Sequence, residues 1–207
     1  MEKIIVAISR EFGSGGRLVG EIVAKKLGIQ QFDRSLIELA AEKSGLSTEF
    51  IEKSEEQATS SFLFSLAASA QAQSGYFMHY DTPITDKAFF AQSAVIKELA
   101  AKGSCVILGR CAGFILKESS DLLSIMIRGD LEDRIRRCRD EYKLEDQDIK
   151  NLVIKRDKAR ANYHKHYTSE SWYDTRAYNL VLDTTYMGIE GAADAIIAAI
   201  EAHKNLR

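Results

Sequence analysis

The opening of the chain constrains the fold more than any other segment. Residues 4–8 form a continuous apolar run of mostly β-branched side chains, which is typical of a strand buried on both faces of a parallel sheet. Residues 13–16 read Gly-Ser-Gly-Gly, and from Arg17 the apolar residues recur at helical spacing until Gly28. The sequence therefore predicts a strand, a glycine-rich loop and a helix within its first thirty residues.

The glycine-rich loop has the composition of a phosphate-binding loop. A plain turn between a strand and a helix needs one glycine, and this turn has three within four residues. Glycines let backbone N–H groups approach an anion, and the N-terminus of the following helix adds its positive dipole end. We therefore predict that donor phosphates are bound by Gly13, Ser14, Gly15, Gly16, Arg17 and Leu18.

Two known loop patterns can be compared with this one. The dinucleotide-binding pattern G-x-G-x-x-G fits poorly because its third glycine is Leu18 here, so we prefer the P-loop pattern. Glu11 stands at the first glycine of that pattern, Arg17 replaces the lysine, and apolar residues replace the hydroxyl that holds Mg²⁺. An arginine still binds phosphate. Magnesium then needs another ligand, and Ser14, Asp183 or water alone remain the alternatives.

Strands and helices alternate along the rest of the chain. Further strands are predicted at 29–32, 105–108, 122–127 and 180–182, and helices at 35–43, near 60–73, 85–102, 131–142, 146–167 and 189–203. This alternation implies a mostly parallel sheet covered on both faces, with ligands beyond the carboxyl ends of the strands. Those ends carry Ser9-Arg10, Asp33-Arg34, Gly109-Arg110, Arg128 and Asp183-Thr184.

Composition narrows the class of protein. A length of 207 residues suits a single domain, and a formal net charge of -2 argues against nucleic acid as a partner. No apolar run is long enough for a membrane span or a signal peptide, so we expect a cytoplasmic protein with no membrane partner. Three cysteines without a C-x-x-C pair and four histidines make a zinc site improbable.

Four segments carry a resemblance to a known family. Residues 6–17, Val-Ala-Ile-Ser-Arg-Glu-Phe-Gly-Ser-Gly-Gly-Arg, resemble the opening of the cytidylate kinase-like family. Residues 105–111 resemble its strand and G-R turn, residues 157–163 its lid, and residues 178–184 its last strand. These segments occur in the family's order and together span nearly the whole chain.

The resemblance implies an α/β P-loop NTPase fold of the nucleoside monophosphate kinase type. Such a fold has a five-stranded parallel sheet flanked by helices, a lid and a helical acceptor-binding region, which we place at about 150–175 and 45–90 within one domain over 1–207. It also implies transfer of the γ-phosphate of ATP, accompanied by Mg²⁺, to a nucleotide such as CMP.

The resemblance extends to the acceptor site. Gly109-Arg110 matches the turn whose arginine binds the acceptor phosphate, and Asp33-Arg34 occupies the second-strand acceptor site. Cys111 replaces the aspartate that reads cytosine in the family. The resemblance therefore implies an acceptor site at these positions and leaves the base open.

Catalytic arginines and ATP-binding residues are also implied. Arg156 and Arg160 correspond to the lid arginines and, with Arg17, are the expected catalytic residues, while Asp183 and Thr184 are expected beside ATP. The basic run at 134–139 has an open role, since these arginines fit either a solvated helix face or the site.

Three functions remain open at this stage. The first is a kinase that phosphorylates a nucleoside monophosphate, the second a kinase-derived nucleotide-binding module without turnover, and the third a kinase of another small acceptor. A small-molecule nucleotide is the expected partner in the first two. The aromatic residues Phe62, Phe64, Phe89 and Phe90 fit a subdomain core or a dimer face, so a homodimer also stays open.

Overall fold

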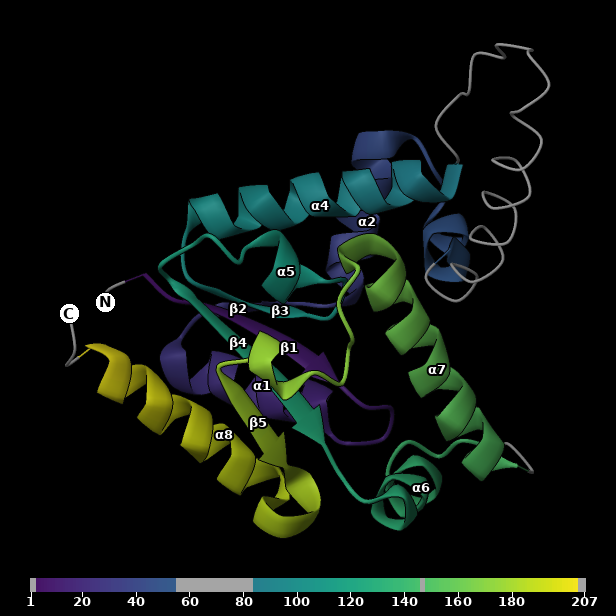
Figure 1. The fold of residues 1–207 in the computed structure, drawn as a ribbon, viewed down its shortest axis with the longest axis vertical. Helices are drawn as coiled ribbons and strands as arrows, with labels where there is room; N and C mark the ends of the chain where they lie inside the picture. Colours follow the sequence, from purple (N-terminus) through teal and green to yellow (C-terminus); the bar gives the residue numbers. More distant parts are fainter. Residues whose placement is uncertain (1–2, 55–83, 146–147, 205–207) are drawn as a thin grey trace.

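The computed structural model describes residues 3–54, 84–145 and 148–204. Its centre is one parallel sheet in the order β2-β3-β1-β4-β5 (Figure 1). The strands are β1 Ile5–Arg10, β2 Gln30–Phe32, β3 Cys105–Leu108, β4 Leu122–Arg128 and β5 Leu180–Asp183. The predicted five-stranded parallel sheet is confirmed, with strand ends shifted by one or two residues.

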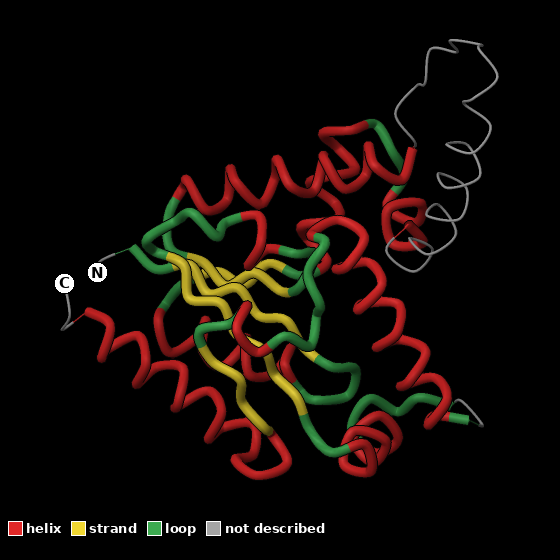
Figure 2. Tube along the Cα trace, in the orientation of Figure 1, coloured by secondary structure: helices red, strands yellow, loops and turns green. Residues whose placement is uncertain are grey.

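The first strand lies in the middle of the sheet. Ile8 of β1 stands opposite Leu108 of β3 on one side and Ile125 of β4 on the other. Because all five strands are parallel, their carboxyl ends meet at one edge, which faces α6 and α7 (Figure 2). The residues predicted at the strand ends are therefore brought to a common edge.

Helices cover both faces of the sheet. They are α1 Gly16–Leu27, α2 Arg34–Ser44, α4 Ile84–Lys102, α5 Ala112–Ile115, α6 Leu131–Asp140, α7 Ile149–Thr168 and α8 Thr184–Lys204, and residues 48–54 are also helical. One core places Ile5 and Ala7 against α2, α4 and α5, and the other places Val6 and Ile8 against α1 and α8. Alternate residues of β1 thus enter opposite cores, which explains why the strand is apolar throughout.

The closing helix differs from its predicted bounds. The closing helix begins at Thr184 rather than at residue 189, because the Asp183 carboxylate accepts a hydrogen bond from the Thr185 amide at 2.9 Å. Gly188 then interrupts it with φ 72°, ψ 176°. The helix predicted near 60–73, and most of the acceptor-binding region predicted at 45–90, lie outside the described residues.

The described residues contain neither a membrane-spanning helix nor a cluster of metal-ligating side chains. None of the helices there has the length and apolar character that crossing a bilayer requires, and no group of three or more His, Cys, Asp or Glu side chains there is arranged to hold a metal ion. All three cysteines lie within the described residues, are buried and form no disulfide.

Candidate active site

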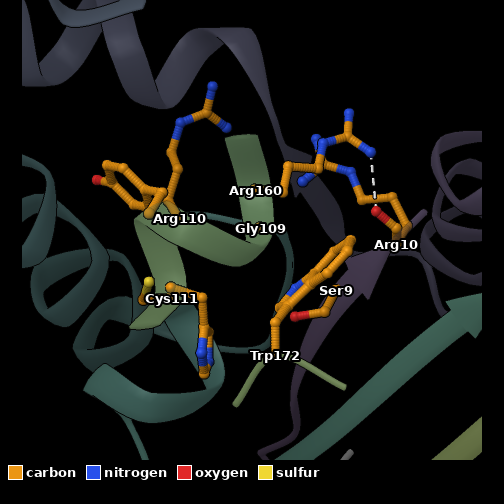
Figure 3. A pocket seen from close by; sticks show the side chains of 9 residues that line it. Ser9, Arg10, Gly109, Arg110, Cys111, Arg160 and Trp172 are labelled. Atoms are coloured by element: carbon orange, nitrogen blue, oxygen red, sulfur yellow. Dashed lines mark hydrogen bonds between the residues drawn. The ribbon is translucent and has the colours of Figure 1, made fainter. Parts of the chain in front are cut away.

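Two adjoining pockets lie at the carboxyl edge of the sheet. The first, here called the loop pocket, is lined by Arg10, Glu11, Phe12, Gly13, Gly15, Gly16, Arg17, Asp33, Tyr142 and Arg160. The second, here called the arginine pocket, is lined by Ser9, Arg10, Gly109, Arg110, Cys111, Arg160, Tyr163, His164 and Trp172 (Figure 3). Arg10 and Arg160 belong to both, so the two spaces share a wall.

The glycine-rich loop leaves several amides unbound. Gly13 and Gly15 adopt left-handed backbone conformations, with φ 79° and 77°. The Ser14 amide donates to the Glu11 carbonyl, whereas the amides of Gly13, Gly15 and Gly16 donate to no acceptor within the described part of the chain. Unbound amides at the start of a helix are the donors that anion sites use.

The fully buried Ser14 side chain faces the protein interior. Its hydroxyl donates to the Glu11 carbonyl at 2.9 Å, and Ser14 is not among the residues that line the loop pocket. This placement argues against Ser14 as a magnesium ligand. The hydroxyl instead closes the turn that carries the free amides.

Asp183 and Thr184 support the loop from behind. The buried Thr184 hydroxyl lies 2.7 Å from the Ser14 carbonyl and 3.1 Å from the Arg128 carbonyl. Asp183 pairs with Arg128 at 3.2 Å and caps α8. Neither residue lines the two pockets. The predicted direct contact of these residues with ATP therefore finds no support in the geometry.

The guanidinium that contacts the glycine-rich loop belongs to Arg137 of α6 and not to Arg17 of α1. Arg17 has a side chain that is 69% exposed and is bonded to Glu21 at 3.0 Å, so it reaches the loop pocket only at its rim. Arg137 is 11% exposed and donates from Nη1 to the Gly13 carbonyl at 2.8 Å. A Cβ added to Gly15 would lie 3.6 Å from the Arg137 Nε. The buried guanidinium at the loop therefore comes from α6.

A buried ionic cluster holds the residues that precede the loop. Asp157 of α7 accepts from the Phe12 amide at 2.7 Å and from Arg134 of α6 at 2.5 Å. Arg134 also lies 3.6 Å from Glu11, which accepts from the Gly129 amide at 3.1 Å. Burial raises the pKa of Glu11, while the Gly129 bond and Arg134 act in the opposite direction. Glu11, the departure from the P-loop pattern, thus anchors the loop.

Arginines from three segments lie at the border of the pockets, and two of them contact one carboxylate. Asp33 Oδ1 lies 3.5 Å from Arg10 and 3.2 Å from Arg110, whose side chain is 7% exposed. Arg160 of α7 donates to the Arg10 carbonyl at 2.8 Å (Figure 3). All three guanidiniums line the arginine pocket, and planar charged donors in a partly buried space favour an anionic ligand.

The position of the Arg10 side chain also explains why residues 16 and 109 are glycine. A Cβ added to Gly16 would lie 2.5 Å from the Arg10 Cβ, and one added to Gly109 would lie 2.0 Å from the Arg10 Nη1. Gly109 has φ 71° in addition. Both glycines therefore leave room for an arginine that lines both pockets.

Aromatic side chains close one side of the arginine pocket. Tyr163 of α7 donates its hydroxyl to Gln92 of α4 at 2.9 Å, and Phe89 stacks on Tyr167 with ring centroids 3.9 Å apart. Trp172 is buried, and its carbonyl accepts from the Tyr178 hydroxyl at 2.8 Å. The contacts between α4 and α7 hold Tyr163 in place on this side of the pocket.

The structure separates the predicted site residues into two groups. It brings Asp33, Gly109, Arg110 and Arg160 together with the glycine loop. Arg34, which was predicted at the acceptor site, has a side chain that is 79% exposed and lies 3.7 Å from Glu52, and it lines neither pocket. Arg156 is not among the residues that line either pocket.

Two residues were not among the predicted site residues: Arg10, which lines both pockets, and Arg137, which contacts the glycine loop without lining either pocket. Arg10 directly follows a buried strand, and its position at a strand end was a usable signal. Arg137 lies three residues after Arg134 and one before Cys138, both of which are buried. This i, i+3, i+4 spacing places all three on one face of α6 and distinguishes Arg137 from the exposed Arg136.

The family is decided by a comparison with family models. The model described as the cytidylate kinase-like family matches residues 5–186, which is most of the chain. The chain belongs to the cytidylate kinase-like family. The resemblance in the four sequence segments is confirmed, and the site of this cytidylate kinase-like protein lies within the matched range. The search of curated proteins gave no match.

Solved structures similar to this cytidylate kinase-like protein share its fold. An uncharacterized protein from Eubacterium ventriosum is 26% identical, with a TM-score of 0.68 over 96% of this chain and 99% of that one. A shikimate kinase from Acinetobacter baumannii in complex with shikimate is 13% identical, with a TM-score of 0.55 over 98% and 96%. A shikimate kinase from Bacteroides thetaiotaomicron is 14% identical, with a TM-score of 0.54 over 97% and 99%. These likenesses agree with the predicted P-loop kinase fold.

Proposed function

We propose that this cytidylate kinase-like protein transfers the γ-phosphate of ATP to a nucleoside monophosphate, with a CMP-like acceptor favoured. The observation that carries the proposal is the pair of adjoining pockets that share Arg10 and Arg160. A phosphotransferase needs two anions held end to end, and two positively charged spaces with a common wall provide such an arrangement.

The loop pocket is the proposed site of the ATP phosphates. The amides of Gly13, Gly15 and Gly16 supply donors, and the guanidinium of Arg137 takes the place of the missing P-loop lysine. Arg17, exposed and bonded to Glu21, is proposed to contribute less than predicted. In this proposal Arg137 takes the role that the loop pattern predicts for Arg17.

The arginine pocket is the proposed site of the acceptor phosphate. Arg10 and Arg110 both line this pocket. Arg160 lines both pockets, and we propose that its guanidinium stabilises the negative charge that spreads over the phosphoryl group during transfer. Magnesium, which disperses charge on the phosphates when bound, needs hard oxygen ligands. Asp33 lines the loop pocket but already pairs with Arg10 and Arg110, so we propose that the phosphates of ATP themselves would hold the ion.

A turnover assay tests the proposal. Purified protein is incubated with ATP, Mg²⁺ and each of CMP, UMP, AMP and GMP, and ADP formation is measured. We expect ADP formation that depends on the acceptor and is fastest with CMP. No turnover with any of the four would remove the proposed reaction.

A matched pair of variants tests the proposed role of Arg137. Arg137→Gln is expected to lower kcat/KM roughly 100-fold, the usual cost of removing one donor to a reacting anion. Arg136→Gln changes the next residue on α6, whose side chain is 69% exposed and pairs with Asp133, and is expected to change kcat/KM less than about twofold. Equal effects of the two substitutions would contradict the assignment.

A second candidate function is nucleotide binding without turnover. It is favoured by the outward orientation of Arg17 and by the inward orientation of the Ser14 hydroxyl, which leave the loop without the usual lysine and magnesium ligand. Stabilisation by ATP in a thermal-shift assay with no ADP formed would support this candidate. Turnover with a sugar phosphate but with no nucleotide would instead favour a kinase of another small acceptor.

A further inference from the structure

His164 is a buried residue of α7 that lines the arginine pocket. Its Nδ1 atom lies 3.2 Å from the Glu170 carbonyl oxygen and 3.1 Å from the Thr168 hydroxyl oxygen. The Thr168 hydroxyl itself donates to the His164 carbonyl at 2.7 Å. These contacts hold one edge of the imidazole against the end of α7.

The contacts fix which ring nitrogen carries the proton. A backbone carbonyl only accepts hydrogen bonds, so Nδ1 must be the donor towards Glu170. The single hydroxyl hydrogen of Thr168 is used on the His164 carbonyl, so the hydroxyl oxygen can only accept from Nδ1 as well. In the neutral ring, Nε2 therefore keeps a lone pair. Burial lowers the pKa of His164, which favours the neutral ring.

The lone pair on Nε2 stands out among the groups of the arginine pocket. Nε2 has no hydrogen-bond partner within the described residues. The nine residues that line the pocket include no carboxylate and no side-chain amide. The guanidiniums of Arg10, Arg110 and Arg160 only donate hydrogen bonds. In the neutral ring, Nε2 is thus a hydrogen-bond acceptor in a pocket whose charged side chains, all arginines, can only donate hydrogen bonds.

We propose that Nε2 of His164 accepts a hydrogen bond from a hydroxyl or amino group of the acceptor substrate. The inference rests on the proposed function and narrows it: the acceptor carries an anion, bound by the arginines, and a hydrogen-bond donor, bound by His164. The thiol of Cys111, which lines the same pocket, is only a weak hydrogen-bonding group. His164 then determines which phosphorylated compounds are accepted.

A structural role of His164 makes a different prediction. If the ring only closed the end of α7 through Nδ1, any side chain that keeps this donor would preserve both folding and binding. Asparagine places an amide N–H near the position of Nδ1 and has no group at the position of Nε2. Glutamine reaches the position of Nε2 with an acceptor oxygen.

Nitrogen NMR of histidine-labelled protein tests the protonation state without any ligand. At about pH 7.5, which is above the ordinary histidine pKa, we expect His164 to have its proton on Nδ1 and an unprotonated Nε2. A ring protonated on Nε2 would overturn the inference, whatever the outcome of the kinase assay.

Calorimetry with CMP and with inorganic phosphate tests the proposed contact. His164→Asn is expected to bind CMP about 5- to 10-fold more weakly, the value of one neutral hydrogen bond, and to bind phosphate as the wild type does. His164→Gln is expected to recover most of the CMP affinity. The control Thr168→Val removes a neighbouring hydroxyl and is expected to lower the melting temperature without weakening CMP binding.

The outcomes separate the inference from the proposed function. Failure of the wild-type protein to bind CMP or to form ADP counts against the proposed function. A wild-type protein that binds CMP, together with a His164→Asn variant of equal CMP affinity, counts against the inference. Equal weakening of CMP and phosphate binding in His164→Asn would also overturn it, because a general disturbance of the pocket would explain that result.

Discussion

Replacement of Asp157 by alanine is the sharpest test of how the loop is held. Asp157 and Arg134 have side chains that are 8% and 9% exposed, so the pair is largely removed from water. Removing the carboxylate leaves the Arg134 guanidinium buried beside two weaker partners, Glu11 at 3.6 Å and the Phe12 carbonyl at 3.3 Å. It also takes the acceptor from the Phe12 amide. Breaking a buried ion pair on one side costs about 3–5 kcal/mol.

This cost is large for a protein of this size. Total stabilities are about 5–15 kcal/mol, and for domains of this length 1 kcal/mol lowers Tm by about 2–4 °C. We therefore expect Asp157→Ala to lower Tm by roughly 6–20 °C. Urea unfolding followed by circular dichroism measures the free energy directly. Asp157→Asn, which keeps an acceptor oxygen for the Phe12 amide, is expected to lose less.

The control for this experiment lies on α6. Arg136→Ala removes a side chain that is 69% exposed, together with its pair to Asp133, and is expected to change the free energy of unfolding by less than about 1 kcal/mol. An Asp157→Ala variant that loses no more than this control would refute the reasoning. The loop would then be held by its own turn and not by the buried cluster.

Three other outcomes are expected. Gly15→Ala places a Cβ 2.1 Å from the Ile189 Cδ1 at φ 77°, so thermal-shift assays should record lower stability and weaker ATP binding. The control Gly28→Ala adds its Cβ in open space and should cost only about 1–2 kcal/mol of backbone strain. Burial lowers the pKa of His164 below its ordinary 6.5. As the pH drops below that value, the unfolded state binds the proton first, so the free energy of unfolding falls. Urea unfolding of His164→Asn should lack this part of the pH dependence. Burial raises the pKa of Cys105 to about 11, so mass spectrometry after iodoacetamide treatment should find this thiol alkylated in urea and unmodified in the native protein.

The sequence predicted the fold because each strand has a local signature. The apolar run at 4–8 and the segment 105–108 need burial on both faces, and only a covered parallel sheet provides it. Asp33 and Arg110 were predicted at the site because strand ends of a parallel sheet share one edge, a consequence of topology alone.

The directions in which individual arginine side chains point could not be predicted from the sequence. Arg17 follows the loop directly, yet its guanidinium binds Glu21 one turn later on α1, because an exposed i, i+4 pair is available there. Arg137 reaches the loop from a helix more than a hundred residues away in sequence. Its role depends on how α6 packs against the loop, which no local pattern records. His164 was likewise invisible, since its significance comes from the contacts of Thr168 and Glu170.

The side chain at position 10 has a consequence for how relatives of this chain should vary. Gly16 and Gly109 lie in different motifs, and each is approached by the same arginine. The atom nearest to the added Cβ of Gly16 is the Arg10 Cβ, at 2.5 Å, so any side chain at position 10 excludes alanine at position 16, whereas position 109 favours glycine because of its φ of 71°. Positions 16 and 109 are therefore both expected to stay glycine across the family, position 16 for lack of space and position 109 for its backbone conformation.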